Sequence, residues 1–227
     1  MTEFRAWIIL ILVPLACIGL FIWLAPPRHN PLAPIDLTEK PGFGTWHKLT
    51  RAKKQPEACF DALTEAGVLY TPLNNSPKGE KCGMYNALSL GQSYTPFSAP
   101  LRMTCAQTAA LYTWERHIVA PAAISILGSP VARIETYGSF SCRNIAGTRR
   151  ASEHAGANAI DISGFRLKDG RLIDVKTHWK AGGREAKFLR KVHKGGCKLF
   201  SVTLGPDYNA AHADHFHMDM GSGSSCR

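Results

Sequence analysis

The chain has 227 residues, with 27 Lys and Arg against 17 Asp and Glu, and its formal net charge is +10 at neutral pH. Hydrophobic residues make up 45% and charged residues 19% of it, which is typical of a folded domain and excludes wholesale disorder. It has no glycine period, sustained heptad or recurring unit, which excludes collagen, coiled coils and repeat arrays. Only one stretch is apolar enough to cross a bilayer, which excludes a polytopic membrane protein.

That stretch is the first feature along the chain, residues 6–25, and it reads AWIILILVPLACIGLFIWLA. A helix of this length rises about 30 Å, the thickness of the bilayer hydrocarbon. Trp7 and Trp23 stand near its ends, where membrane interfaces favour aromatic rings. We therefore expect residues 1–25 to form a single-pass membrane anchor. A cleaved signal peptide is the alternative, although the apolar run is long for one and no A-x-A site follows it.

Six cysteines beyond this segment are widely spaced and form no C-x-x-C motif: Cys59, Cys82, Cys105, Cys142, Cys197 and Cys226. An even number with this spread favours three disulfides over a zinc ribbon or a redox motif, and buried free thiols are the alternative. Cys59 with Cys82 is the simplest pair to guess. Disulfides imply an oxidising compartment, so we expect a domain in the bacterial periplasm, held at the inner membrane.

Residues 26–54 are rich in proline and lack a hydrophobic period, which predicts an extended linker before a domain over residues 55–227. Patterns in that domain predict a helix over 57–67, a longer helix capped by Thr104 and a helix over 183–194. Pro121 marks a kink or a new first turn. A loop is expected over 71–81. Strands are expected over 68–70, 131–137, 159–167, 172–175, 199–204 and 216–220, with a hairpin turn at 168–171. The mixture predicts an α+β fold, a small antiparallel sheet with flanking helices.

Two polar segments carry the candidate chemistry, SEHAGANAID at residues 152–161 and HADHFHMD at residues 212–219. The period of two in a strand places His215, His217 and Asp219 on one face. Asp161 stands between two isoleucines and so projects away from them, while His154 lies on the loop before it. Two imidazoles and one carboxylate from separate segments are a typical ligand set of a catalytic zinc ion, with the fourth position left for water.

The pattern S-x-H-x-x-G-x-A-x-D followed by H-x-x-H-x-H resembles that of the zinc D,D-peptidases of bacterial cell walls, which share a fold with the hedgehog signalling domain. The region from about residue 59 to 227 is more closely similar to the bacterial extensin-like C-terminal family, which is placed in the same superfamily. The segments that carry this similarity are GSFSCRN, SEHAGANAIDISGFRL and LGPDYNAAHADHFHMD. The resemblance implies a hedgehog/D,D-peptidase-like fold.

The resemblance also implies roles for individual residues. His154, Asp161 and His217 would bind Zn²⁺, and His215 would be the catalytic histidine that assists the chemistry. Many D,D-dipeptidases have a glutamate base three residues before the last ligand, where this chain has Asp214. The general base therefore stays open between His215 and Asp214, and Asp214 could instead orient an imidazole.

Three further residues match positions that contact substrate or line the site in the peptidases. Arg143 matches an arginine that captures the substrate carboxylate, and its planar fork suits that task. Ser152 matches a serine that helps to hold the substrate, and His212 matches an additional histidine of some members. Taken without the resemblance, Arg143 could form a structural ion pair and Ser152 could be a turn or cap residue.

We therefore expect a zinc-dependent metallopeptidase, a D,D-carboxypeptidase or endopeptidase that cleaves D-amino-acid-containing peptides of peptidoglycan. The alternative is a zinc-containing cell-wall-binding module without hydrolysis, and hydrolysis of ordinary L-peptides is a weaker third possibility. No nucleic-acid-binding motif accompanies the positive charge. The expected partners are instead peptidoglycan and acidic lipid headgroups, with solubility as the alternative reason for the charge.

Overall fold

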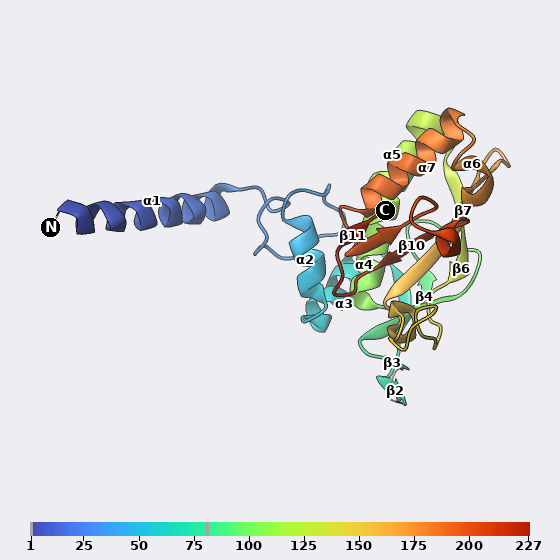
Figure 1. Ribbon diagram of the computed structural model, residues 1–227, viewed down its shortest axis with the longest axis horizontal. Helices are drawn as coiled ribbons and strands as arrows, with labels where there is room; N and C mark the ends of the chain where they lie inside the picture. Colours follow the sequence, from blue (N-terminus) through green and yellow to red (C-terminus); the bar gives the residue numbers. More distant parts are fainter. Residues whose placement is uncertain (1, 80–81) are drawn as a thin grey trace.

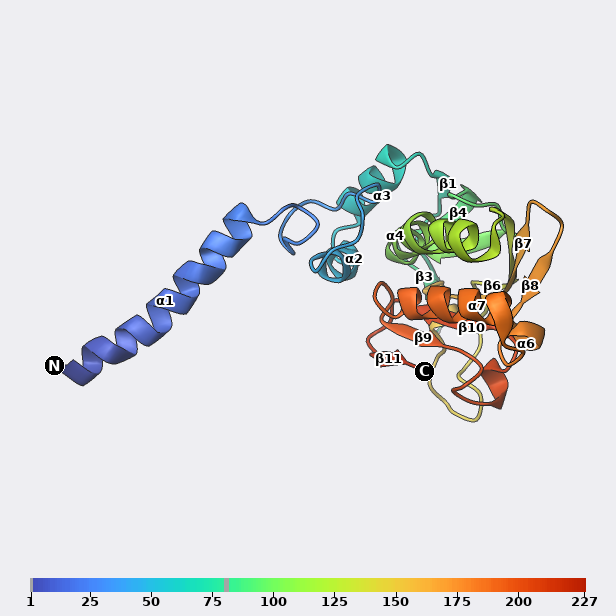
Figure 2. The same ribbon diagram turned by 90° about the horizontal axis from the view of Figure 1, so that it is seen from above.

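The computed structural model describes residues 2–79 and 82–227 (Figure 1). Helix α1 (Thr2–Leu24) projects away from an α+β body in which helices pack on small sheets (Figure 2). No helix among the described residues is long and apolar enough to cross a membrane. The structure thus gives no support to the membrane anchor predicted over residues 1–25, of which Met1 lies outside the described residues.

The largest sheet has six strands, and β7 is its centre, because β7 pairs with β6, β8 and β10. In sheet order the strands are β11 (Ser225–Cys226), β9 (Val202–Leu204), β10 (Phe216–Asp219), β7 (Ala159–Leu167) and β6 (Val131–Gly138), with β8 (Leu172–Asp174) also paired to β7. All these pairings are antiparallel except β11 with β9. The predicted antiparallel sheet is therefore confirmed apart from its last edge strand.

Two smaller sheets lie in the segment before α4. One contains β1 (Leu69–Pro72), β4 (Ala87–Gln92) and β5 (Leu101–Thr104), and the other contains β2 (Ser76–Lys78) and β3 (Cys82–Met84). The loop predicted over 71–81 is wrong for most of its described part, because β1 extends into it and β2 lies within it. Residues 80 and 81 of that range lie outside the described residues.

The longest helical run begins with α4 (Cys105–Trp114), and the Thr104 cap predicted for it is confirmed, because the Thr104 hydroxyl accepts the amide of Gln107. The run continues through η1 (Glu115–Val119), α5 (Ala120–Ala122) and η2 (Ala123–Leu127). Pro121 lies in the first turn of α5, between two π turns, where its missing amide hydrogen is tolerated. The helical run continues through it, and of the two predicted alternatives the structure shows the new first turn.

Helices α4 and α7 (Gly183–Gly196) cover one face of the six-stranded sheet (Figures 1 and 2). On that face Ile160 and Ile162 of β7 and Phe216 and Met218 of β10 are all fully buried. The register pairs Phe216 with Ile162 and Met218 with Ile160. Asp161 of β7 and His217 of β10 lie between these residues and are paired with each other. Because side chains alternate along a strand, both project from the opposite face, which carries the candidate site.

Residues 26–54 differ from the extended linker that their prolines predict. They contain α2 (Thr45–Ala52), which lies before α3 (Pro56–Glu65), and they bury Leu37 and Leu49 in the main core. The guanidinium of Arg51 donates to the carbonyls of Pro31 and Ala33, at 2.8 and 2.7 Å. The segment therefore packs as part of the folded body, a result of tertiary burial that its local composition does not reveal.

Three disulfides join the six cysteines as predicted, and Cys17 is free. The pairs are Cys59–Cys105, Cys82–Cys142 and Cys197–Cys226. The simplest guess, Cys59 with Cys82, is wrong. Cys59 lies on α3, which packs against α4, and the first residue of α4 is its partner. Pairing thus follows the contact between two helices rather than proximity along the chain.

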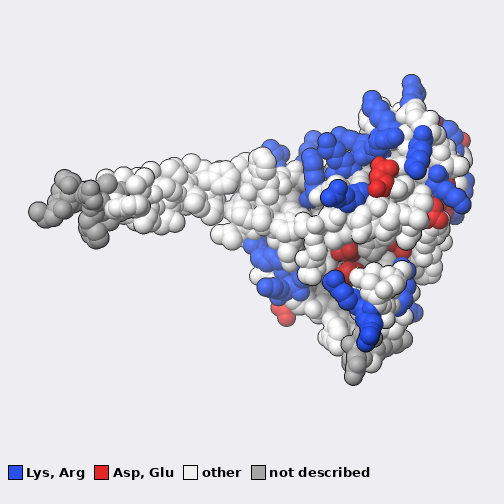
Figure 3. Space-filling model, viewed as in Figure 1, with Lys and Arg blue, Asp and Glu red and all other residues white. Residues whose placement is uncertain are grey.

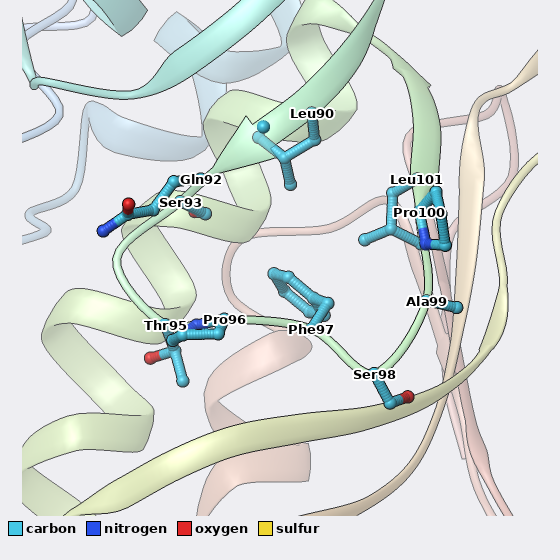
Figure 4. Close-up of a pocket in the computed structure, with 11 residues that line it drawn as sticks. Leu90, Gln92, Ser93, Thr95, Pro96, Phe97, Ser98, Ala99, Pro100 and Leu101 are labelled. Carbon is cyan, nitrogen blue, oxygen red and sulfur yellow. The ribbon is translucent and has the colours of Figure 1, made fainter.

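A cavity of about 320 Å³ lies between β4 and β5, lined by residues 90–93 and 95–101 (Figure 4). Two of its lining residues hold Glu115, which is fully buried in η1. Ser93 Oγ and the Thr95 amide donate to the two carboxyl oxygens of Glu115, at 2.6 and 2.7 Å. Burial outweighs these hydrogen bonds and raises the pKa of Glu115 to about 8.

Candidate metal centre

The three predicted ligands converge on the face of the sheet opposite α4 and α7. His154 Nε2 lies 3.1 Å from His217 Nδ1 and 3.2 Å from Asp161 Oδ1, and His217 Nδ1 lies 3.0 Å from Asp161 Oδ1. A tetrahedral zinc ion with bonds of about 2.0–2.1 Å separates its ligand atoms by about 3.3 Å. The side chains are at most 13% exposed. The three atoms thus lie close to the spacing that such an ion requires.

Strand register and one tight turn bring these groups together. Asp161 of β7 is paired directly with His217 of β10. His154 lies in the short helix η3 (Glu153–Gly156), which leads into β7 and ends at Ala157 with a φ of 56°. Ser152 caps η3, because its hydroxyl accepts the amide of His154 at 3.3 Å. The cap therefore holds His154 against the start of the strand that carries Asp161.

The second nitrogen of each histidine is engaged away from the centre. His154 Nδ1–H donates to the carbonyl of Ser139, and His217 Nε2–H donates to Asp219 Oδ2 at 3.0 Å. Asp219 is buried, and its other oxygen accepts the amide of Gly221 at 2.7 Å. These partners fix the tautomers, so that the nitrogens with free lone pairs, His154 Nε2 and His217 Nδ1, face each other.

When both imidazoles are neutral, their two lone pairs and the Asp161 carboxylate are three acceptors with no donor between them, so the arrangement requires a positive charge, which a proton on His217 or a metal ion can supply. Burial by itself lowers the pKa of His217, but hydrogen bonds to Asp161 and Asp219 outweigh burial and raise it to about 9. Burial likewise opposes ionisation of Asp161, but hydrogen bonds from His154 and His217 hold its pKa below its usual range. The donor set of two nitrogens and one oxygen fits zinc.

His215 lies beside the three ligands, and its two ring nitrogens have different partners. Nδ1–H donates to Asp214 Oδ1 at 2.9 Å, whereas Nε2 lies 3.6 Å from Asp161 Oδ1. Asp214 Oδ2 accepts the hydroxyl of Tyr137 at 3.4 Å, and the Tyr137 ring packs edge-on against His215. The hydrogen bond from His215 lowers the pKa of Asp214. In this geometry Asp214 orients His215, and His215 presents a free nitrogen to the centre.

The remaining predicted residues lie around the same centre. Arg143 reaches Asp161 Oδ2 with one guanidinium nitrogen at 3.5 Å, and its side chain is 54% exposed. His212 contacts the rings of His215 and His217, with centroid distances of 5.3 and 5.8 Å. Burial and the charges of those two neighbours lower the pKa of His212 to about 4. The structure brings every predicted site residue to one place.

Sequence reasoning missed two groups and left a third open. Tyr137 is placed only in a strand by its pattern, and its contact with Asp214 depends on how β6 packs beside the histidine segment. Ser139 contributes a backbone carbonyl, for which no side-chain signal exists. Asp219 is on the expected face of β10, and its alternation with His217 is the signal that identifies it.

Comparison with known families assigns most of the chain. The model of the family described as extensin-like protein C-terminus matches residues 57–227. The chain belongs to this family. The matched extensin-like region contains every residue of the candidate metal centre and begins within α3, so it leaves out α2 and the packed segment before it. Comparison with curated proteins gives no match.

Proposed function

We propose that the protein is a zinc-dependent peptidase that cleaves D-amino-acid-containing peptides of peptidoglycan, as a D,D-carboxypeptidase or endopeptidase. One arrangement carries the proposal. His154, Asp161 and His217 present three convergent ligand atoms, and His215 directs a free nitrogen toward the same point. A module that only binds a metal for stability needs no such additional acceptor.

The chain's own groups would divide the chemistry between them. A zinc ion held by His154, Asp161 and His217 would supply Lewis acidity, which would lower the pKa of a water and polarise a peptide carbonyl. His215 Nε2 would accept a proton and later return it to the leaving amine, while Asp214 keeps the ring in the required tautomer. Arg143 is more than half exposed and retains donors for the terminal carboxylate of a peptide.

We further propose that this activity takes place in the bacterial periplasm. Three disulfides are stable in an oxidising compartment, and peptidoglycan is present there. The exposed guanidinium beside the centre favours a peptide that ends in a carboxylate, as the stem peptides of the wall do. The proposal does not depend on α1.

The test is incubation of the zinc-loaded full chain with intact peptidoglycan and with soluble pentapeptide muropeptides, followed by liquid chromatography and mass spectrometry. His154→Ala removes one ligand, and His178→Ala is the matched control, because His178 lies outside the centre and bonds to Asp174. Release of D-Ala or loss of cross-linked dimers by the parent and the control alone supports the proposal. Binding to the wall without any product would instead support a zinc-containing wall-binding module.

A further inference from the structure

A row of cations follows the exposed side of α7. Arg184, Lys187, Lys191 and Lys194 of α7 stand at steps of three and four residues, Lys198 follows two residues beyond the end of the helix, and all five are exposed. Residues at these steps are neighbours on one face of a helix. The row, called here the α7 basic stripe, extends over about 15 Å of helix from Arg184 to Lys194 and continues to Lys198. Lysine and arginine side chains gather over α7 in the upper part of Figure 3.

The cations of the stripe form no ion pair with the acidic side chains that the structure describes. Within residues 2–79 and 82–227, no Asp or Glu oxygen lies within 4.0 Å of their charged nitrogens. Glu185, the acidic residue of α7, pairs with Arg171 instead, at 3.7 Å. Arg190 differs from the stripe, because its guanidinium packs over Trp179 and donates to the Trp179 carbonyl. The stripe is therefore a set of unneutralised charges held on a rigid support.

The opposite side of α7 is fully occupied. Ala186, Leu189 and Val192 are at most 2% exposed and pack in the core. The helix thus has no apolar face with which to enter a bilayer, and any attraction must be electrostatic. Among the described residues, the phenyl ring of α7, that of Phe188, is fully buried, so the stripe offers no stacking platform of the kind that single-stranded nucleic acids use.

We propose that the α7 basic stripe docks the domain on an anionic lipid bilayer. Four cations on one face of an outward-facing helix, with Lys198 just beyond its end, can contact a plane of anionic headgroups together, and each contributes electrostatic attraction. The stripe lies on the helical side of the six-stranded sheet, and the candidate metal centre lies on the other side. Docking would therefore direct the centre away from the lipid. The meaning of that orientation for catalysis rests on the proposed function, but the docking itself does not.

The test is sedimentation of the full chain with phosphatidylcholine vesicles that contain or lack phosphatidylglycerol. Any binding through the exposed apolar residues of α1 would be common to both kinds of vesicle, so the difference between them measures the contribution of the stripe. We expect Lys191→Gln/Lys194→Gln to weaken the binding that depends on phosphatidylglycerol by about 25-fold, or about fivefold for each lysine. Lys191→Arg/Lys194→Arg should restore it, and high salt should abolish it.

The matched control is Lys40→Gln/Lys168→Gln, which removes two exposed lysines that lie outside α7. If the control weakens binding as much as the stripe variant does, net charge alone is responsible and the proposal is overturned. Equal binding of the parent to both kinds of vesicle overturns the proposal as well. It is also overturned if the stripe variant loses binding to a linear polyphosphate but keeps its binding to vesicles. None of these readouts involves peptidase activity, so failure of the proposed function would leave them unchanged.

Discussion

The Nε2–H of His217 donates to Asp219 Oδ2 at 3.0 Å, and this bond fixes which nitrogen of His217 faces the candidate centre. Asp219 is 4% exposed and is held in turn by the amide of Gly221. A buried carboxylate in this position orients the imidazole and increases its basicity. Asp219 is therefore predicted to support zinc binding without touching the ion.

Replacement of Asp219 tests this role. We expect Asp219→Ala to lower zinc affinity by about 10- to 100-fold, and Asp219→Asn to lower it less, because an amide oxygen can still accept from His217. Competition with a fluorescent zinc chelator gives the affinity. Asp169→Asn, in an exposed turn, is the control and should bind zinc as the parent does. Parent-like affinity in Asp219→Ala would contradict the orienting role.

Zinc affinity should also depend on pH, with a sign that follows from His217. The raised pKa of about 9 means that metal-free His217 carries a proton at neutral pH, and zinc must displace it. Affinity should therefore rise by about tenfold per pH unit up to about pH 9 and level off above it. In Asp219→Asn the plateau should begin at lower pH, because one of the hydrogen bonds that raise this pKa is weakened. A flat profile for the parent between neutral pH and pH 9 would contradict the interpretation.

The two residues left open as general base can be separated by kinetics. If His215 is the proton acceptor, His215→Ala should lower kcat by about 10²- to 10⁴-fold with zinc retained. Asp214→Asn should lower kcat by a smaller factor, because it removes the orienting charge and leaves the imidazole in place. Tyr137→Phe is the mild control, since it removes one long hydrogen bond to Asp214. A larger loss in Asp214→Asn than in His215→Ala would identify Asp214 as the base.

Glu115 predicts a pH dependence of folding that is independent of the metal centre. Its pKa is raised by burial to about 8, so the stability it permits is fully present below the ordinary carboxyl pKa and is lost as pH rises through about 8. Relative to the parent, Glu115→Gln should therefore gain stability steadily as pH rises from the ordinary carboxyl pKa to about 8, and the difference should stay constant above that pH. Urea unfolding at several pH values measures this. A parallel fall in both proteins would show that Glu115 is not responsible.

Local patterns account for much of the fold. The hairpin of β7 and β8, the helix α7 and the Thr104 cap follow from periodicity and turn residues, which act over a few positions. The candidate ligands were chosen by the resemblance to the zinc D,D-peptidases, and alternation along β7 and β10 accounts for Asp161 and His217 sharing a face. In each case the physical cause lies within one segment or one pair of strands.

Other features depend on contacts between distant segments and were not predicted. The partner of Cys59 is set by the packing of α3 on α4, and the burial of Leu49 is set by surfaces outside its own segment. The hydrogen bond by which Asp214 orients His215 could not be predicted, because it depends on the direction of the His215 ring in the fold. Such relationships arise only when the whole chain is packed, because sequence spacing does not specify which surfaces meet.

The packed segment before residue 57 makes the region that folds around one core longer than the region that the family match covers. The family match starts within α3, yet Leu49 lies in the shared core, and the ammonium group of Lys53 donates to the carbonyl of Gly221, two residues beyond Asp219. The region that the family match identifies is thus shorter than the region whose side chains complete the hydrophobic core. A gene fragment that began at the family boundary would encode all the candidate ligands of the centre. It would lack the segment before residue 57 that packs in the core supporting them.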